Sequence, residues 1–184
     1  MDDGLVEMVV ESVRVHMLSS RHVVILKEAA RDRYLPIWIG PWEANAIAMK
    51  LQGLTPERPL THDLFATMLD ELGARILRVV ITALADETFH ARILLERDGR
   101  IMEVDARPSD ALALAVRSDV KIFAASTVLE QAALGGNADL GGAEGGLGST
   151  HEATGEQLVD PRLDVFRDFV NSLDADAEGG NRSS

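Results

Sequence analysis

Three short polar clusters hold the residue types that phosphate chemistry uses. They are Trp38-Ile39-Gly40-Pro41-Trp42-Glu43-Ala44, Arg58-Pro59-Leu60-Thr61-His62-Asp63 and Asp105-Ala106-Arg107-Pro108-Ser109-Asp110. Each combines an acidic side chain with a turn-forming Pro or Gly, and two of them add an arginine. Carboxylates bind divalent cations, and guanidinium groups form paired hydrogen bonds with phosphate. If the clusters meet in one cleft, the pattern predicts metal-assisted cleavage of phosphodiester bonds.

Four carboxylates in the clusters are candidates for this chemistry. We expect Asp105 and Asp110 to bind a divalent metal, Mg²⁺ or Mn²⁺, and Glu43 and Asp63 to act as supporting catalytic acids. An acid in the first turn of a helix also offsets the partial positive charge of the exposed N–H groups. Glu43, Asp63 and Asp110 are therefore open to a purely helix-capping interpretation. Asp105 instead lies between a strand end and a helix start, where site residues are often displayed.

The basic side chains of the clusters supply the remaining functions. His62 is the candidate general acid or base, because the ordinary pKa of histidine lies near neutrality. Arg58 and Arg107 are the candidate phosphate-binding groups. Each also has a plainer interpretation: His62 as a solvated residue in a first helical turn, and the arginines as members of surface ion pairs. Thr61 is expected to be the N-cap of its helix.

Composition limits the classes of protein and site. The 184 residues include no cysteine, which excludes disulfides, thiolate zinc sites and a cysteine nucleophile. The formal net charge of −12 argues against passive nucleic-acid binding over the whole surface, which needs a surplus of Lys and Arg. Residues 1–134 hold 15 Lys and Arg against 20 Asp and Glu, so the acidity is concentrated further along the chain. A local basic or metal-bridged site on the domain is therefore compatible with the composition.

Hydrophobic periodicity predicts one α+β domain over residues 1–134. Strands are expected at 6–17, 22–27, 35–39, 74–84, 89–96, 100–104 and 120–124, with the dipeptide Asp98-Gly99 as a hairpin turn. Helices are expected to begin at Pro41 and to occupy 61–72, 108–117 and 127–134. The order corresponds to two antiparallel meanders in a mixed sheet, packed with about three main helices. The apolar stripe of the 61–72 helix is expected to pack inward; it consists of Leu64, Phe65, Met68, Leu69 and Leu72.

The remaining residues have a different composition. Residues 135–155 are rich in Gly and predict a flexible linker, residues 156–174 an amphipathic helix, and residues 175–184 a disordered tail. Such a helix is marginal alone, so we expect it to dock on its own domain, another subunit or a protein partner. No signal-like leader and no apolar run long enough to span a membrane is visible. We therefore expect a cytoplasmic protein that makes no membrane contact.

The three clusters also carry a resemblance. The segments 35–44, 58–64 and 104–111 resemble the bifunctional nuclease domain family, formerly a domain of unknown function, and the resemblance covers Leu5 to Leu134. It implies an α+β domain, frequent self-association, and nuclease activity on DNA and RNA. The resemblance does not assign catalytic residues, so the roles above come from chemistry alone. A non-catalytic oligomeric module that binds a small ligand or a protein is the alternative function.

Overall fold

The computed structural model describes residues 4–16 and 21–135. The pattern of contacts separates a first unit, Met1–Ala133, from Leu134–Ser184. Apart from Gly135, the predicted linker, the predicted helix at 156–174 and the predicted tail at 175–184 lie outside the described residues and stay predictions. Over the ranges that are described, no helix has the length and apolar character needed to cross a membrane.

The helices and strands lie close to their predicted positions. The strands are β1 Leu5–His16, β2 Arg21–Glu28, β3 Arg33–Ile39, β4 Ala74–Ala85, β5 Thr88–Arg97, β6 Arg100–Ala106, β7 Lys121–Ala125 and β8 Leu134–Gly135. The helices are α1 Pro41–Leu51, α2 Thr61–Glu71, α3 Pro108–Ser118 and α4 Ser126–Ala132. Pro41 and Pro108 begin α1 and α3, where the missing N–H of proline costs no hydrogen bond.

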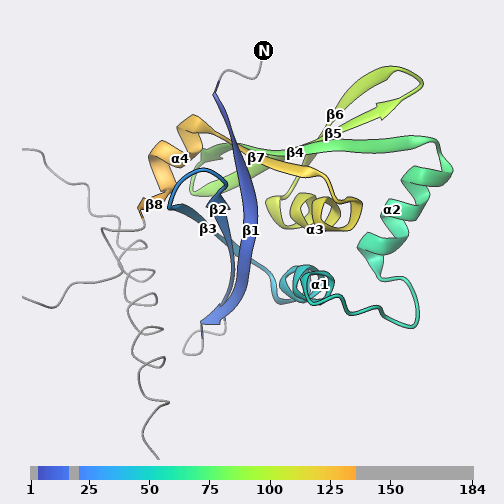
Figure 1. Ribbon diagram of the computed structural model, residues 1–184, viewed down its shortest axis with the longest axis horizontal. Helices are drawn as coiled ribbons and strands as arrows, with labels where there is room; N and C mark the ends of the chain where they lie inside the picture. Colours follow the sequence, from blue (N-terminus) through green and yellow to red (C-terminus); the bar gives the residue numbers. More distant parts are fainter. Residues whose placement is uncertain (1–3, 17–20, 136–184) are drawn as a thin grey trace, which may run out of the picture. The chain divides into compact units, whose positions relative to one another are not determined.

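The strands of the first unit form one mixed sheet in the order β6-β5-β4-β7-β1-β2-β3 (Figure 1). β1, β2 and β3 form one antiparallel meander, and β4, β5 and β6 form the other. β7 joins the meanders, since it pairs antiparallel with β1 (Val6 with Ala124) and parallel with β4 (Val79 with Ile122). The α+β prediction with two antiparallel meanders is confirmed.

The hairpin between β5 and β6 forms as its sequence predicts. Asp98 and Gly99 both have positive φ, at 52° and 75°, as a two-residue type I′ turn requires. The preceding hairpin uses the same left-handed conformation without a glycine, because Asp86 and Glu87 have φ of 47° and 60°. The turn at Asp86 and Glu87 leads into β5, whose first residues line the same cavity as the helix starts described below.

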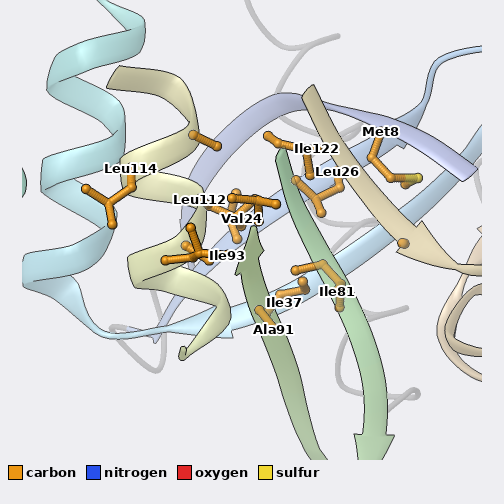
Figure 2. Packing of buried hydrophobic residues seen from close by; sticks show 14 of the residues in the cluster. Met8, Val24, Leu26, Ile37, Ile81, Ala91, Ile93, Leu112, Leu114 and Ile122 are labelled. Carbon is orange, nitrogen blue, oxygen red and sulfur yellow. The ribbon is translucent and has the colours of Figure 1, made fainter. Parts of the chain in front are cut away.

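The core is centred on α3. Ala111, Leu112, Ala113, Leu114 and Ala115 are all buried, because α3 contacts β4, β5 and β7 as well as α1 and α2. Figure 2 shows Leu112 within the same cluster as Val24 of β2 and Ile93 of β5. Truncation of a buried leucine typically costs 2–5 kcal/mol, so this packing holds α3, and the polar residues at its first turn, in a fixed position.

Two predictions about α2 are wrong. The N-cap residue is Leu60 and not Thr61, and the cap is made from within the helix: Asp63 Oδ2 accepts a hydrogen bond from the Leu60 backbone N–H at 2.9 Å. A carboxylate at the third helical position replaces the threonine hydroxyl that was expected at the N-cap position.

Four of the five residues of the predicted apolar stripe do not pack inward. Leu64, Phe65, Met68 and Leu72 are 46–55% exposed, and α2 has no fully buried residue. Contact with the core comes instead through Ala66 and Leu69, which are partly buried. The helix is oriented so that Ala66 and Leu69 are its apolar residues packed against the core, and the other four are about half exposed.

Candidate active site

Arg107 connects the first and third sequence clusters. It is the N-cap residue of α3, and its Nε donates a hydrogen bond to Asp110 Oδ2 at 2.8 Å. Its Nη2 donates to Asp110 Oδ1 at 3.2 Å and to Glu43 Oε1 at 2.9 Å. Asp110 lies in the first turn of α3 and Glu43 in the first turn of α1. The arginine therefore bridges two helix starts, and its paired contact with Asp110 fixes the direction of the guanidinium group.

His62 brings in the second cluster. Its Nε2 lies 3.2 Å from Asp110 Oδ1, and its side chain is only 15% exposed. A continuous series of contacts, Glu43 to Arg107 to Asp110 to His62, thus connects the first turns of α1, α3 and α2. We call these four residues the arginine network. Four of the seven residues singled out in the sequence belong to it.

Asp63 lies beside the network and binds a different arginine. Arg117, in the last turn of α3, donates from Nε to Asp63 Oδ1 at 2.6 Å, and its side chain is only 6% exposed. Arg117 also donates to the carbonyl oxygens of Ala113 and Ala46, at 3.0 and 3.1 Å. This buried arginine connects α1, α2 and α3 through Ala46, Asp63 and Ala113. In the sequence, Arg117 is visible as a basic residue near a helix end, and its contact with Asp63 cannot be read from that position.

Asp105 and Arg58 are not brought to the network. Asp105 is exposed on β6, opposite Arg92 of β5 in the strand register. Arg58 is exposed in the segment between α1 and α2. Among the residues that the structure describes, no hydrogen bond or ion pair connects either side chain to the other site residues.

The electrostatics of the network favour an ionised Asp110. Partial burial opposes its charged form, but the hydrogen bonds and charges of Arg107 and His62 outweigh that effect and hold its pKa below the ordinary value of 3.8. Asp110 in turn raises the pKa of Arg107, with a smaller contribution from Glu43. At neutral pH Asp110 therefore accepts hydrogen bonds and donates none.

Gly40 leaves room for the contact between Glu43 and Arg107. It is the N-cap residue of α1, with an extended backbone that other residues also adopt (φ −73°, ψ 159°). A Cβ atom at this position would overlap Glu43 Oε2. The absence of a side chain at position 40 thus lets the Glu43 carboxylate fold back across the helix start, where its other oxygen meets Arg107.

The predicted metal site depends on which His, Asp and Glu side chains lie close together. No group of three or more His, Asp or Glu side chains within the described ranges is arranged to hold an ion. Mg²⁺ commonly takes only one or two protein carboxylates and completes its coordination with water and substrate phosphate. Glu43 and Asp110, whose carboxylates both contact Arg107, would supply the two protein carboxylates of such a site. Asp105 shares no contact with Asp110.

A cleft of about 560 Å³ borders the network. Arg107 lines it, together with residues at the start of α1 and α3, including Pro41 and Pro108. The first-turn N–H groups of a helix have no intrahelical acceptor and attract anions. The cleft therefore places an accessible cavity, two helix starts and an exposed guanidinium group next to one another.

One family model matches this chain, and several known proteins are similar to it. The family model described as Bifunctional nuclease domain matches residues 24–136, which include the whole network. Uncharacterized protein MT1877 and Uncharacterized protein Rv1829, from two strains of Mycobacterium tuberculosis, are each 40% identical over 170 residues, or 92% of this chain and 96% of theirs. Bifunctional nuclease 1 of Arabidopsis thaliana is 26% identical over 103 residues, or 54% of this chain and 32% of that protein. The 170-residue similarity is longer than the first unit and therefore extends beyond it.

Proposed function

Because this chain belongs to the bifunctional nuclease domain family, we propose that it hydrolyses phosphodiester bonds of DNA and RNA at the arginine network. The observation that supports this most directly is the contact series that holds Arg107 and His62 on either side of Asp110. Phosphodiester hydrolysis needs a group that binds the charged phosphate and a group that transfers a proton. Arginine and histidine are suited to these two roles.

Arg107 is the proposed phosphate-binding residue. Its side chain is 67% exposed although it is paired with two carboxylates, so substrate can reach it. Asp110 and Glu43 then act as positioning residues that hold the guanidinium group towards the cleft. Arg58, exposed ahead of α2, is proposed to contact the phosphate backbone further along the strand.

His62 is the proposed general acid or base. Ionised Asp110 accepts a hydrogen bond from its Nε2, which leaves Nδ1 as the atom that exchanges a proton with the attacking water or the leaving oxygen. Asp63 supports this residue indirectly, because its contacts with Arg117 and the Leu60 N–H hold the start of α2. We regard Asp63 as a positioning residue.

We include a divalent metal, Mg²⁺ or Mn²⁺, in the proposal. Glu43 and Asp110 would hold it, with Asp105 as a further candidate ligand to be tested by substitution. When bound, such an ion supplies a Lewis acid that stabilises negative charge on the phosphate oxygens.

The test is a nuclease assay on highly purified protein with single-stranded DNA and RNA, with Mg²⁺ or Mn²⁺ and with EDTA. We expect His62→Gln and Arg107→Ala to lower the rate by two orders of magnitude or more, in line with roughly 10²–10⁴-fold for general acid–base catalysis. Arg75→Ala is the matched control, because Arg75 is similarly exposed (72%) and paired with one carboxylate, Glu96, away from the network. Equal rates in all three variants and the wild type would mean a contaminant or a different site, and the proposal would be abandoned.

The exposed face of α2 supports the alternative of an oligomeric, non-catalytic module. Leu64, Phe65, Met68 and Leu72 form an apolar surface of the kind that marks protein contacts. Under this alternative, copies of the chain associate through α2, and the cleft binds a small ligand without turnover. Light scattering of the wild type and of Leu64→Lys/Met68→Lys tests the association. A monomeric wild type would remove the oligomeric module from consideration.

A further inference from the structure

The cleft contains polar groups that the arginine network does not use. Its walls come from β2, β3, the turn between β4 and β5, and the starts of α1 and α3. Besides Arg107, the lining includes Arg21, His22 and Ser109. None of these three has a role in the proposed hydrolysis.

One of these residues has a buried atom without a partner. Nδ1 of His22 is buried and has no hydrogen-bond partner among the described residues. Buried polar groups in folded proteins nearly always have one. Ser109 is only 6% exposed and lines the same cavity as His22, so a polar ligand in the cavity would lie next to both side chains.

The charges and the helix geometry indicate that this ligand is an anion. The Arg21 guanidinium lies 4.4 Å from the centre of the Trp38 ring, and an arginine stacked in this way keeps its charge and the N–H groups at its edge. Arg107 contributes a second positive charge to the lining. Ser109 stands in the first turn of α3 and follows Pro108, which has no N–H; the N–H groups of Asp110 and Ala111 donate to the Arg107 carbonyl oxygen, so the N–H of Ser109 is the one placed to attract phosphate.

The remaining wall is apolar and includes the aromatic side chains of Trp38 and Phe89. A cavity of about 560 Å³ falls within the usual range for small-molecule sites. The cavity has room for one nucleotide. A base inside a duplex would have to leave the stack of bases before it could enter. The combination of a phosphate-binding end with an aromatic wall is what an unpaired nucleotide requires.

We propose that this cleft binds one unpaired nucleotide, with its phosphate at Ser109 and Arg107 and its base against the aromatic wall. The inference rests on the proposed function in one respect: Arg107 is shared, so the bound nucleotide is the one adjoining the scissile phosphate. The preferred substrate is accordingly a single strand or an unpaired end.

The first experiment measures binding without catalysis. The chain has two tryptophans, so Trp42→Phe leaves Trp38 as the sole fluorescent tryptophan, and Trp42 is 82% exposed and outside the cleft lining. We expect UMP to change this fluorescence saturably and to bind about tenfold or more tighter than uridine or inorganic phosphate. Equal binding of phosphate and UMP would reduce the cleft to a simple anion site, and no UMP binding would eliminate it; either result overturns the inference.

Substitutions then assign the binding to the two buried groups. Ser109→Ala should weaken UMP binding about tenfold, the loss expected for one hydrogen bond to a charged group. Ser118→Ala is the matched control, because Ser118 is exposed at the far end of the same helix, and it should bind UMP as the wild type does. His22→Phe should weaken UMP binding while leaving the melting temperature unchanged or higher, since it removes an unsatisfied nitrogen. If a variant fails to fold, the comparison of UMP, uridine and phosphate in the Trp42→Phe protein still decides.

The same preparations separate this inference from the proposed function. UMP binding that depends on Ser109, without hydrolysis of any strand, would leave the nucleotide site standing and remove the nuclease. If the wild type hydrolyses the strand but does not bind UMP, and Arg107→Ala abolishes the hydrolysis, the nuclease would stand and the nucleotide site would be removed. A faster rate on a single strand than on the same sequence within a hairpin stem is expected if both hold.

Discussion

The buried arginine behind the network offers the sharpest test of how the helix starts are held together. Arg117 is 6% exposed and donates to Asp63 and to two backbone carbonyl groups that belong to α1 and α3. We predict that Arg117→Met destabilises the domain although methionine fills much of the same volume. The substitution removes three hydrogen bonds and leaves the Asp63 carboxylate without its main counter-charge.

The expected loss follows from burial. Removal of one member of a buried ion pair typically costs 3–5 kcal/mol, but the Asp63 side chain is 30% exposed and keeps its bond from the Leu60 N–H. We therefore expect a loss of about 3 kcal/mol in the free energy of unfolding, which corresponds to a fall of roughly 10 °C in melting temperature for a domain of this size. Arg92→Met is the control, because Arg92 and Glu103 form a comparably short pair that is about half exposed, where a loss of about 0–1 kcal/mol is usual.

A double-mutant cycle measures the pair itself. Urea unfolding of Arg117→Met, Asp63→Asn and the double variant gives the coupling energy, which we expect to be about 1–3 kcal/mol. The pH dependence supplies a second readout. Burial opposes ionisation of Asp63, but Arg117 and the Leu60 N–H hold its pKa below 3.8. Its contribution to stability is therefore complete above about pH 4 and is lost as the pH falls through the lowered pKa, and Arg117→Met should flatten this acid limb.

Two results would refute the reasoning. A loss in Arg117→Met no larger than in Arg92→Met would mean that the pair behaves as a surface contact. A coupling energy near zero would mean that Arg117 stabilises the helices only through the carbonyl groups of Ala113 and Ala46.

Three further predictions concern single positions. Gly40→Ala should displace the Glu43 carboxylate from Arg107, so it should lower the nuclease rate to that of Glu43→Gln while changing the melting temperature little; a wild-type rate would count against the contact. Asp119→Gly should raise the free energy of unfolding by about 0.5–1 kcal/mol, because Asp119 ends α3 with φ of 52° and glycine adopts that conformation without strain; urea denaturation measures it, and a loss would contradict the account. Asp110→Asn should remove part of the stability that the wild type gains above about pH 4, since the pKa of Asp110 is lowered; superimposable pH–stability curves would refute this.

The secondary structure could be predicted because its signals are local. Asp98-Gly99 contains the two residue types that tolerate a left-handed turn, and both have positive φ. The Ala-Leu run of α3 is too apolar for a surface helix, and it is buried. Such patterns depend on neighbours in sequence, so they do not require knowledge of what packs against them.

The orientation of α2 and the pairing of the site residues depend on distant parts of the chain. Periodicity shows which face of α2 is apolar, but Leu64 and Met68 are exposed because the helix packs against the core through Ala66 and Leu69. The contact between Arg107 and Glu43 spans 64 positions, and that between Arg117 and Asp63 spans 54. A helix-start acid looks the same in sequence whether it caps its own helix or binds an arginine from another. Asp63 does both.

The charge of the network makes a last prediction possible. Glu43 and Asp110 are negative, Arg107 is positive, and with His62 neutral the four side chains carry a net formal charge of −1. The two carboxylates weaken the attraction of Arg107 for a phosphate group, and a bound cation would strengthen it. One divalent ion would change the local charge to +1, which is how a protein of net charge −12 can accept a polyanion.

Binding of a non-hydrolysable single-stranded oligonucleotide should therefore depend on the metal. We expect affinity to be weak in EDTA and to rise with Mg²⁺ or Mn²⁺. Glu43→Gln, which neutralises one carboxylate, should bind better than the wild type in EDTA and gain less from the metal. The control is Glu103→Gln, which makes the same change of charge at a residue of β6 outside the network and should preserve the wild-type response. Affinity that is the same with and without metal in every protein would show that the acids of the network do not govern access of phosphate, and the metal would then have no part in the proposed mechanism.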